Sequence, residues 1–165
     1  MENEKNNIWN EIVKYLIKNN LTIATMESCT GGGIVNEITS ISGASSVLRE
    51  SYVTYCNEAK IKQGVPAEII EKFSVYSAET AESMAVAVKK CANSNFGIGV
   101  TGQLGRIDPK NPIDKLNLVW YAIIDDNNKV FVKKLEVPDC ERKFQKEFVI
   151  EKIGNSLLEI FGNKL

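Results

Sequence analysis

The segment TIATMESCTGGG, residues 22–33, combines several groups that could do chemistry. A carboxylate, two hydroxyls and a thiol follow a short apolar run, and three glycines come directly after them. Glycine permits unusual dihedral angles and close backbone approach, and the free N–H groups of a starting helix attract anions. The pattern indicates a small-anion cradle that carries a nucleophile. The spacing fits equally well a simpler interpretation, in which Ser28 or Thr30 is a helix N-cap and the glycines pack against a sheet.

The absence of histidine limits the chemistry that this chain can perform. Ser-His-Asp and Cys-His machinery, HExxH metalloprotease sites and His-ligated zinc sites are all excluded for its own side chains. Proton transfer must therefore use lysine, a carboxylate, tyrosine, cysteine or water. The four cysteines, Cys29, Cys56, Cys91 and Cys140, are too scattered to form a CxxC pair, and we expect reduced thiols.

Composition and charge are those of an ordinary globular protein, with 44% hydrophobic and 25% charged residues in a chain of 165. This length suits a single domain over residues 1–165. The net charge of −1 provides no basic field for nucleic acid or an anionic membrane, so we expect neither as a partner. The N-terminal stretch has no uninterrupted apolar run typical of a signal peptide, which favours a cytoplasmic location.

Hydrophobic periodicity predicts alternating helices and strands followed by a hairpin. We expect helices at about 5–19, 33–41, 57–64 and 66–73, a longer one capped by Ser77 and running to about 90, and a last one at about 140–161. The predicted strands cover residues 21–25, 47–55, 96–102, 118–125 and 129–137. This order favours an α/β fold with a mixed sheet covered on both faces. The first strand is expected to end near Thr25, which places residues 27–30 outside the carboxyl edge of the sheet, where ligands gather in such folds.

Four segments, taken together, resemble the CinA C-terminal domain family over about residues 5–161. They are ESCTGG (27–32), GASSV with VTYCNEAK (43–47 and 53–60), VYSAETAESMA (75–85) and GVTG (99–102). The resemblance implies a three-layer α/β/α sandwich with a mixed, partly antiparallel sheet, and neither metal nor cofactor. The family includes stand-alone nicotinamide-nucleotide amidases, which hydrolyse nicotinamide mononucleotide to nicotinate mononucleotide and ammonia.

The resemblance also implies a serine hydrolase, with Ser28 as nucleophile, Lys60 as its base and Tyr55 relaying or positioning the proton. Without histidine, the lysine must act in its neutral form, which requires burial or neighbouring positive charge to lower its pKa by several units. Taken alone, Lys60 is more simply a solvated surface charge, and Tyr55 a packed strand residue. Cys29 has no histidine to activate it, so we expect a small packed side chain.

Eight further residues are candidates for holding the substrate. Glu27 is expected to orient Lys60 or to accept a ribose hydroxyl, or else to be a surface carboxylate favoured by a helix dipole. The others offer hydroxyl or backbone donors: Thr30, Gly31 and Gly32 in the glycine turn, Ser45 and Ser46 as a second wall, and Thr101 and Gly102 as amide or oxyanion contacts. Ser45, Ser46, Thr101 and Gly102 are equally typical of ordinary turns.

The stretch TGQLGRIDPKNPIDKLNL, residues 101–118, departs from the family pattern, which has Ala-Gly-Pro, a glycine-rich loop and a later Gly-Thr. Here the loop is bulkier and more charged, and Asn117-Leu118 stands in place of Gly-Thr. Three outcomes remain open: the same amidase with an altered rim, an amidase for another carboxamide, or a catalytically impaired module that binds a nucleotide or phosphate and acts through a partner protein. We expect a small-molecule nucleotide as ligand and a homodimer.

Overall fold

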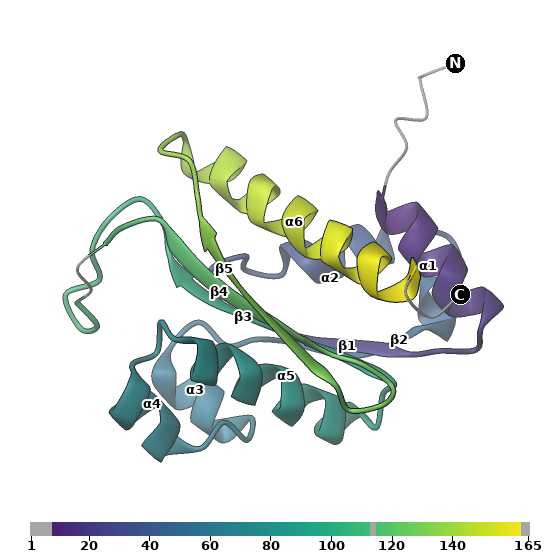
Figure 1. Ribbon diagram of the computed structural model, residues 1–165, viewed down its shortest axis with the longest axis horizontal. Helices are drawn as coiled ribbons and strands as arrows, with labels where there is room; N and C mark the ends of the chain where they lie inside the picture. Colours follow the sequence, from purple (N-terminus) through teal and green to yellow (C-terminus); the bar gives the residue numbers. More distant parts are fainter. Residues whose placement is uncertain (1–7, 113–114, 163–165) are drawn as a thin grey trace.

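The computed structural model describes residues 8–112 and 115–162. A five-stranded sheet lies between two layers of helices, which confirms the predicted three-layer α/β/α sandwich with a mixed sheet (Figure 1). Within the described residues, no helix is long and apolar enough to cross a membrane.

The sheet has the strand order β2-β1-β3-β4-β5. Its strands are β1 (Ile23–Glu27), β2 (Leu48–Val53), β3 (Phe96–Gln103), β4 (Leu118–Ile124) and β5 (Val130–Glu136). The first three strands run parallel to one another, while β4 and β5 are antiparallel additions that follow β3 as a meander. The predicted hairpin around the polar DDNN turn is therefore confirmed.

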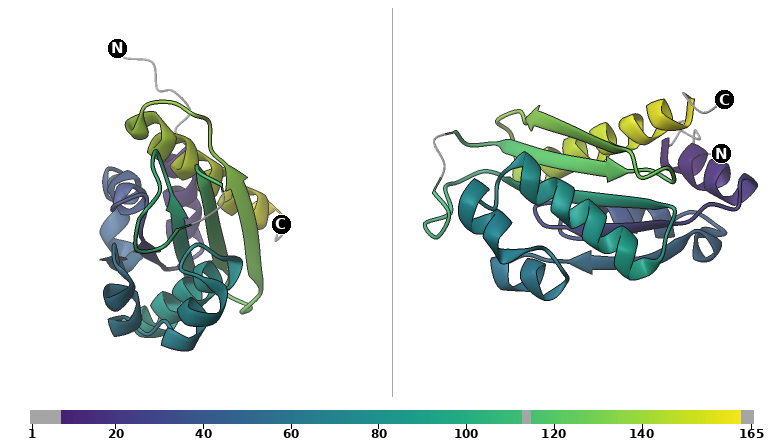
Figure 2. Two further views of the ribbon diagram at one scale, coloured as in Figure 1. Left: turned by 90° about the vertical axis from the view of Figure 1, so that its left-hand side faces the viewer. Right: turned by 60° about the horizontal axis from the view of Figure 1, so that its bottom comes forward.

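Helices cover both faces of the sheet (Figure 2). On one face lie α1 (Ile8–Lys18), α2 (Gly33–Thr39) and α6 (Arg142–Gly162), and on the other α3 (Asn57–Lys62), α4 (Ala67–Phe73) and α5 (Ala78–Ala92). The larger core fills the space under α1, α2 and α6, and two smaller apolar clusters lie under α5. As predicted, Ser77 caps α5, because its hydroxyl accepts the N–H of Thr80 at 3.1 Å.

The glycines of β3 let α5 pack directly on the centre of the sheet. A Cβ atom at Gly99 would come within 2.3 Å of the Ala81 carbonyl oxygen, and one at Gly97 within 2.4 Å of that of Ala85. Helix α5 contributes small residues at these contacts, so the backbone of α5 packs directly against the backbone of β3.

The first strand extends further than the sequence predicted. It continues through Met26 to Glu27, which pairs with Val53 of β2 and Val100 of β3. The predicted end near Thr25 is wrong because a central strand gains ladder hydrogen bonds on both sides, which override the polar character of Glu27. As a result, Ser28 is the first residue beyond the sheet.

The chain connections place Ser28 at a natural ligand crevice. After β1 the chain crosses to α2 on one face, whereas after β2 it crosses to α3 on the other face. In open α/β sheets, ligands bind beyond the carboxyl ends of strands where neighbouring connections diverge in this way. The residues that follow β1, β2 and β3 therefore meet at one edge.

Candidate functional site

Ser28 is held rigidly at the end of β1. Its N–H donates to the Val100 carbonyl of β3 at 3.0 Å, and its own carbonyl accepts the N–H of Gly31 at 3.0 Å. Gly31 and Gly32 adopt φ values of 60° and 90°, the left-handed region that glycine enters without strain. The glycine turn thus bends the chain sharply away from the strand and leaves the Ser28 side chain at the sheet edge.

The Lys60 ammonium group lies against Ser28. Its Nζ donates to Ser28 Oγ at 3.1 Å and to the Thr54 carbonyl oxygen at 2.7 Å. The side chain is only 1% exposed, although lysine is rarely buried without a counter-charge. The structure therefore brings together two of the three residues predicted to act in catalysis.

Burial changes the chemistry of this lysine. Desolvation disfavours its charged form and lowers the Lys60 pKa from the ordinary value of 10.5 to about 8. The two ion pairs found in the described part of the chain join Lys115 to Glu136 and Lys133 to Glu159, so neither supplies a carboxylate to Lys60. About a tenth of the amine is then neutral at pH 7, and this neutral amine is the form that a general base requires.

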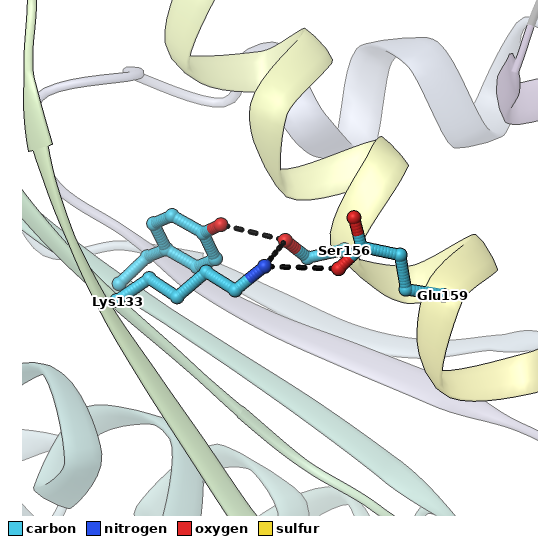
Figure 3. Close-up of polar contacts among 4 residues, drawn as sticks. Lys133, Ser156 and Glu159 are labelled. Atoms are coloured by element: carbon cyan, nitrogen blue, oxygen red, sulfur yellow. Dashed lines mark hydrogen bonds and ion pairs between the residues drawn. The ribbon is translucent and has the colours of Figure 1, made fainter. Parts of the chain in front are cut away.

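A second serine–lysine contact in the same chain shows the contrast (Figure 3). Lys133 donates to Ser156 Oγ at 3.0 Å, and Tyr121 shares the same hydroxyl at 2.7 Å. Lys133, however, is about half exposed and pairs with the Glu159 carboxylate at 3.0 Å. Solvent and a carboxylate therefore stabilise the charged form of Lys133, whereas Lys60 has neither in the described chain. A short distance between lysine and serine is thus not enough to make the lysine a base.

Glu27 serves the helix α2 rather than a substrate. Its buried carboxylate accepts the Thr30 hydroxyl at 2.6 Å and the backbone N–H groups of Gly32, Ile34 and Val35 at 2.9–3.1 Å. The expected roles in orienting Lys60 or binding ribose are wrong for this geometry, because the carboxylate oxygens point into the helix start. The alternative of a surface carboxylate at a helix start is right about the helix start and wrong about the surface, since Glu27 is fully buried.

The anion cradle expected at the glycine turn is therefore already occupied by the protein's own anion. Glu27 neutralises the N–H groups that the pattern assigned to a phosphate, and Thr30 donates its hydroxyl to the same carboxylate. Thr30, Gly31 and Gly32 shape and cap the turn that carries Ser28. The Thr30 hydroxyl and the Gly32 N–H, both predicted to contact substrate, donate to Glu27 instead, and the Gly31 N–H donates to the Ser28 carbonyl.

We expect Glu27→Gln to destabilise the protein by about 3 kcal/mol, because an amide nitrogen would face backbone N–H donors and leave some of them buried without an acceptor. Urea unfolding measures this loss. Glu68→Gln is the matched control, since Glu68 is an exposed carboxylate in the first turn of α4 and its loss should cost only a few tenths of a kcal/mol. Equal losses in the two variants would contradict the capping role of Glu27.

Tyr55 lies at the site but not on the serine–lysine pair. The residue is 63% exposed, and its hydroxyl accepts a hydrogen bond from the Arg142 guanidinium at 3.0 Å. Its predicted relay to Ser28 or Lys60 has no support in this geometry, because the Tyr55 hydroxyl is bonded to Arg142, whereas Lys60 Nζ is bonded to Ser28 and Thr54. Tyr55 instead forms part of the cavity mouth.

Ser45 and Ser46 lie away from Ser28. They are exposed residues of the 3-10 turn η1 (Ala44–Ser46), immediately before β2 begins. Because β1 and β2 are parallel and Ile23 pairs with Leu48, this turn is at the amino edge of the sheet, one strand length from Ser28. The predicted second polar wall is therefore wrong, and the turn interpretation holds.

Thr101 and Gly102 occupy the expected edge in structural roles. The Thr101 hydroxyl donates to the Val75 carbonyl oxygen at 2.8 Å, which ties the start of α5 to β3. A Cβ atom at Gly102 would meet the Leu118 carbonyl oxygen at 2.6 Å, so glycine is needed where β4 pairs. Of the two, only Gly102 lines the cavity described below.

Cys29 is buried, and desolvation raises the pKa of its thiol to about 12. A thiol with such a pKa supplies almost no thiolate at neutral pH. The expectation of a packed, unreactive side chain agrees with this environment.

Among the described residues, no three His, Cys, Asp or Glu side chains gather as a metal site.

A cavity of about 550 Å³ opens beside Ser28. This volume lies within the range of small-molecule sites. Its lining residues come from the turn after β1, the segment after β2, the segment before α5, the end of β3 with its loop, and the start of α6. They are Ser28, Cys29, Tyr55, Tyr76, residues 102–109 and Arg142. Sequence reasoning missed Arg142 and Gln103 as site residues, because neither belongs to a recognisable motif.

The altered loop after β3 forms one wall of this cavity. Tyr76 donates to Asp108 at 3.2 Å, and Asn57 donates to Asn111 at 3.2 Å, so the loop is tied to the α3 and α5 side. Burial and the neighbouring Asp108 raise the pKa of Tyr76, which keeps its phenol protonated as a donor. Asn117 adopts φ 55° and accepts the N–H of Gly105 at 2.9 Å. Asparagine tolerates this left-handed conformation, which explains how it replaces the family glycine.

Comparison with known proteins places this architecture in a family. The model of the CinA C-terminal domain matches residues 5–158. The chain belongs to the CinA C-terminal domain family. A CinA-like protein from Kosmotoga olearia is 36% identical over 155 residues, which are 90% of this chain and 37% of that protein. The chain therefore spans little more than a third of the length of this relative.

Solved structures of CinA proteins share the fold. The competence/damage inducible protein CihA from Agrobacterium tumefaciens is 28% identical, with a TM-score of 0.82 over 96% of this chain and 94% of that one. A CinA superfamily protein from Klebsiella pneumoniae has a TM-score of 0.86 at 19% identity, over 94% and 96% of the two chains. The second likeness concerns the fold alone.

Proposed function

We propose that this CinA domain is a metal-independent amidohydrolase that converts nicotinamide mononucleotide to nicotinate mononucleotide and ammonia. Ser28 is the nucleophile and Lys60 is its general base. The observation that carries the proposal is the buried Lys60 amine, without a carboxylate partner in the described chain, 3.1 Å from the Ser28 hydroxyl. Membership of the family is compatible with an enzyme, while the reaction, the substrate and the mechanism are the proposal.

The proposed reaction uses the serine–lysine pair in two steps. Neutral Lys60 accepts the Ser28 proton as Oγ attacks the amide carbon, and the resulting ammonium then protonates the amide nitrogen, which leaves as ammonia when the C–N bond breaks. Water then attacks the acyl-serine as Lys60 accepts its proton, and Lys60 returns this proton to Ser28 Oγ when the acyl C–O bond breaks and the acid leaves. The Thr54 carbonyl bond holds Nζ in place throughout, so the amine does not have to be ordered during the reaction.

The tetrahedral intermediate requires donors close to its developing negative charge. The backbone N–H groups of Cys29 and Thr30 follow Ser28 in the turn, where donors of this kind act in acyl transfer. The Glu27 cap and the left-handed glycines keep this turn rigid. We assign oxyanion stabilisation to these two backbone groups.

The cavity suits an anionic ligand. Arg142 and Arg106 both line it, and guanidinium groups bind phosphate through paired hydrogen bonds. No described ion pair involves either arginine. The phosphate of a mononucleotide would match this charge, while the carboxamide end reaches Ser28.

The pH dependence of ammonia release tests the proposal. In the presence of a chelator, kcat/KM should rise about tenfold per pH unit below 8 and level off above it, because only neutral Lys60 is a base and its pKa is about 8. Spectroscopic measurement of the fold at each pH serves as the control. A rate that is flat between pH 6 and 8 would contradict lysine as the base.

The alternative is a module that binds the nucleotide without hydrolysing it. The loop after β3 favours this second function, because it departs from the family pattern and lines the cavity with Ile107 and Pro109. A nucleotide that raises the melting temperature of the wild type without any ammonia release would support the binding module and exclude the amidase.

A further inference from the structure

Gln103, the last residue of β3, is an unusual feature of the cavity. It lines the space beside Ser28 and is only 4% exposed. Neither its Oε1 nor its Nε2 atom has a hydrogen-bond partner among the described residues. A buried amide that lacks partners for both its acceptor and its donor lowers the stability of the fold.

Other buried polar groups in the described chain do not share this combination. Gln145 leaves only Oε1 unpaired, because its Nε2 donates to the Pro138 carbonyl oxygen at 2.9 Å. Thr54 leaves only a hydroxyl unpaired. Neither Gln145 nor Thr54 lines the cavity. Of these three residues, only Gln103 both lines the cavity and has an amide group whose two polar atoms are unpaired.

The strand geometry directs Gln103 to the side of the sheet that carries the lysine. Side chains alternate along β3, and Thr101 is bonded to Val75 on the α5 face. Gln103, two residues further on, therefore projects from the same face as Thr101. Lys60 approaches Ser28 from α3 on this face. Gln103 thus lies nearer to the carboxyl end of β3 than the level of Ser28.

We propose that Gln103 recognises the carboxamide of the substrate through two hydrogen bonds between the side-chain amide and the substrate amide. Nε2 donates to the substrate carbonyl oxygen, and Oε1 accepts the N–H on the same side of the substrate amide. This inference rests on the proposed function and names a specificity-determining residue for it. Because both Gln103 atoms are covered from solvent, the pair forms as the cavity wall shifts on binding.

The amide pair explains how the site would distinguish substrate from product. A carboxylate has no N–H, so Oε1 would face a negatively charged oxygen after hydrolysis. A site built to hydrogen-bond a group rejects the analogue that lacks it, because buried polar atoms are left unpaired. Gln103 therefore favours the carboxamide and weakens binding of the acid that the reaction produces.

Binding to the Ser28→Ala variant tests this inference without turnover. Calorimetry with nicotinamide mononucleotide and nicotinate mononucleotide should show at least about tenfold tighter binding of the carboxamide. Adding Gln103→Leu should remove this preference, while Gln145→Leu, at a buried glutamine outside the cavity lining, should change it less than twofold. Thermal unfolding of each variant confirms that it is folded.

The outcomes separate the inference from the proposed function. An unchanged preference in the Gln103→Leu variant overturns the role of Gln103, even if the wild type releases ammonia. Loss of the preference supports the role of Gln103, even if the wild type releases none and the amidase assignment fails. If neither nucleotide binds to Ser28→Ala, both the inference and the nucleotide substrate are overturned.

Discussion

Lys60→Met is expected to lower kcat/KM for ammonia release by at least about 10³ while the protein stays folded. Methionine fills a similar volume but can neither accept the Ser28 proton nor donate one to ammonia. The Nζ contacts with Ser28 and the Thr54 carbonyl are lost together. Lys62→Met is the matched control, because Lys62 is an exposed lysine of the same helix and should tolerate the change without loss of activity.

The same variant should reveal the cost of burying the lysine. The folded pKa is about 8 and the ordinary value is 10.5, so between these values the unfolded chain keeps a proton that the folded chain has lost. Stability of the wild type must therefore rise with pH across this window. We compare the free energy of unfolding of the wild type with that of Lys60→Met. Between pH 7.5 and 10.5, the difference should change by up to about 3 kcal/mol in favour of the wild type.

Urea unfolding of the two proteins at a series of pH values measures this gain. Lys62→Met should follow the wild type, since its exposed ammonium group pays no comparable desolvation penalty. A difference between wild type and Lys60→Met that does not change with pH would show that Lys60 is not destabilised in its charged form. The lowered pKa on which the role of Lys60 as a base depends would then be contradicted.

Ser28→Ala should abolish hydrolysis, with a fall in kcat of about 10⁴ or more, because the acyl intermediate has no oxygen on which to form. The backbone of the glycine turn does not depend on the Ser28 hydroxyl, since Val100 and Gly31 are bonded to its main chain. Binding of the nucleotide should therefore survive. Cys29→Ala is the matched control, because the neighbouring thiol is buried and protonated and should contribute less than a few-fold.

The helices and strands were largely predictable, because their apolar periodicity is strong and their turns contain glycine, asparagine or proline. The end of β1 was misplaced because pairing with β2 and β3 on both sides decides where a central strand stops. The position of Ser45 and Ser46 depends on the same pairing. A parallel register places residues before β2 at the amino edge, and local sequence does not contain that register.

The chemistry of the site was predictable in part. Resemblance to the family pointed to Ser28 and Lys60, and their contact has a physical basis in the fold. Glu27 was misjudged because its partners, such as Ile34 and Val35, lie in the following helix, so only the folded turn shows that the carboxylate is used internally. Arg142 reaches the cavity from the far end of the chain, and no spacing rule connects it to Ser28.

The most direct measurement is ammonia release from nicotinamide mononucleotide by the wild type and by Ser28→Ala, with a chelator present and nicotinate mononucleotide identified as the product. The account predicts chelator-resistant release by the wild type that disappears in Ser28→Ala. Release that persists in Ser28→Ala, or a wild type that binds the nucleotide and releases no ammonia, would contradict the serine amidase.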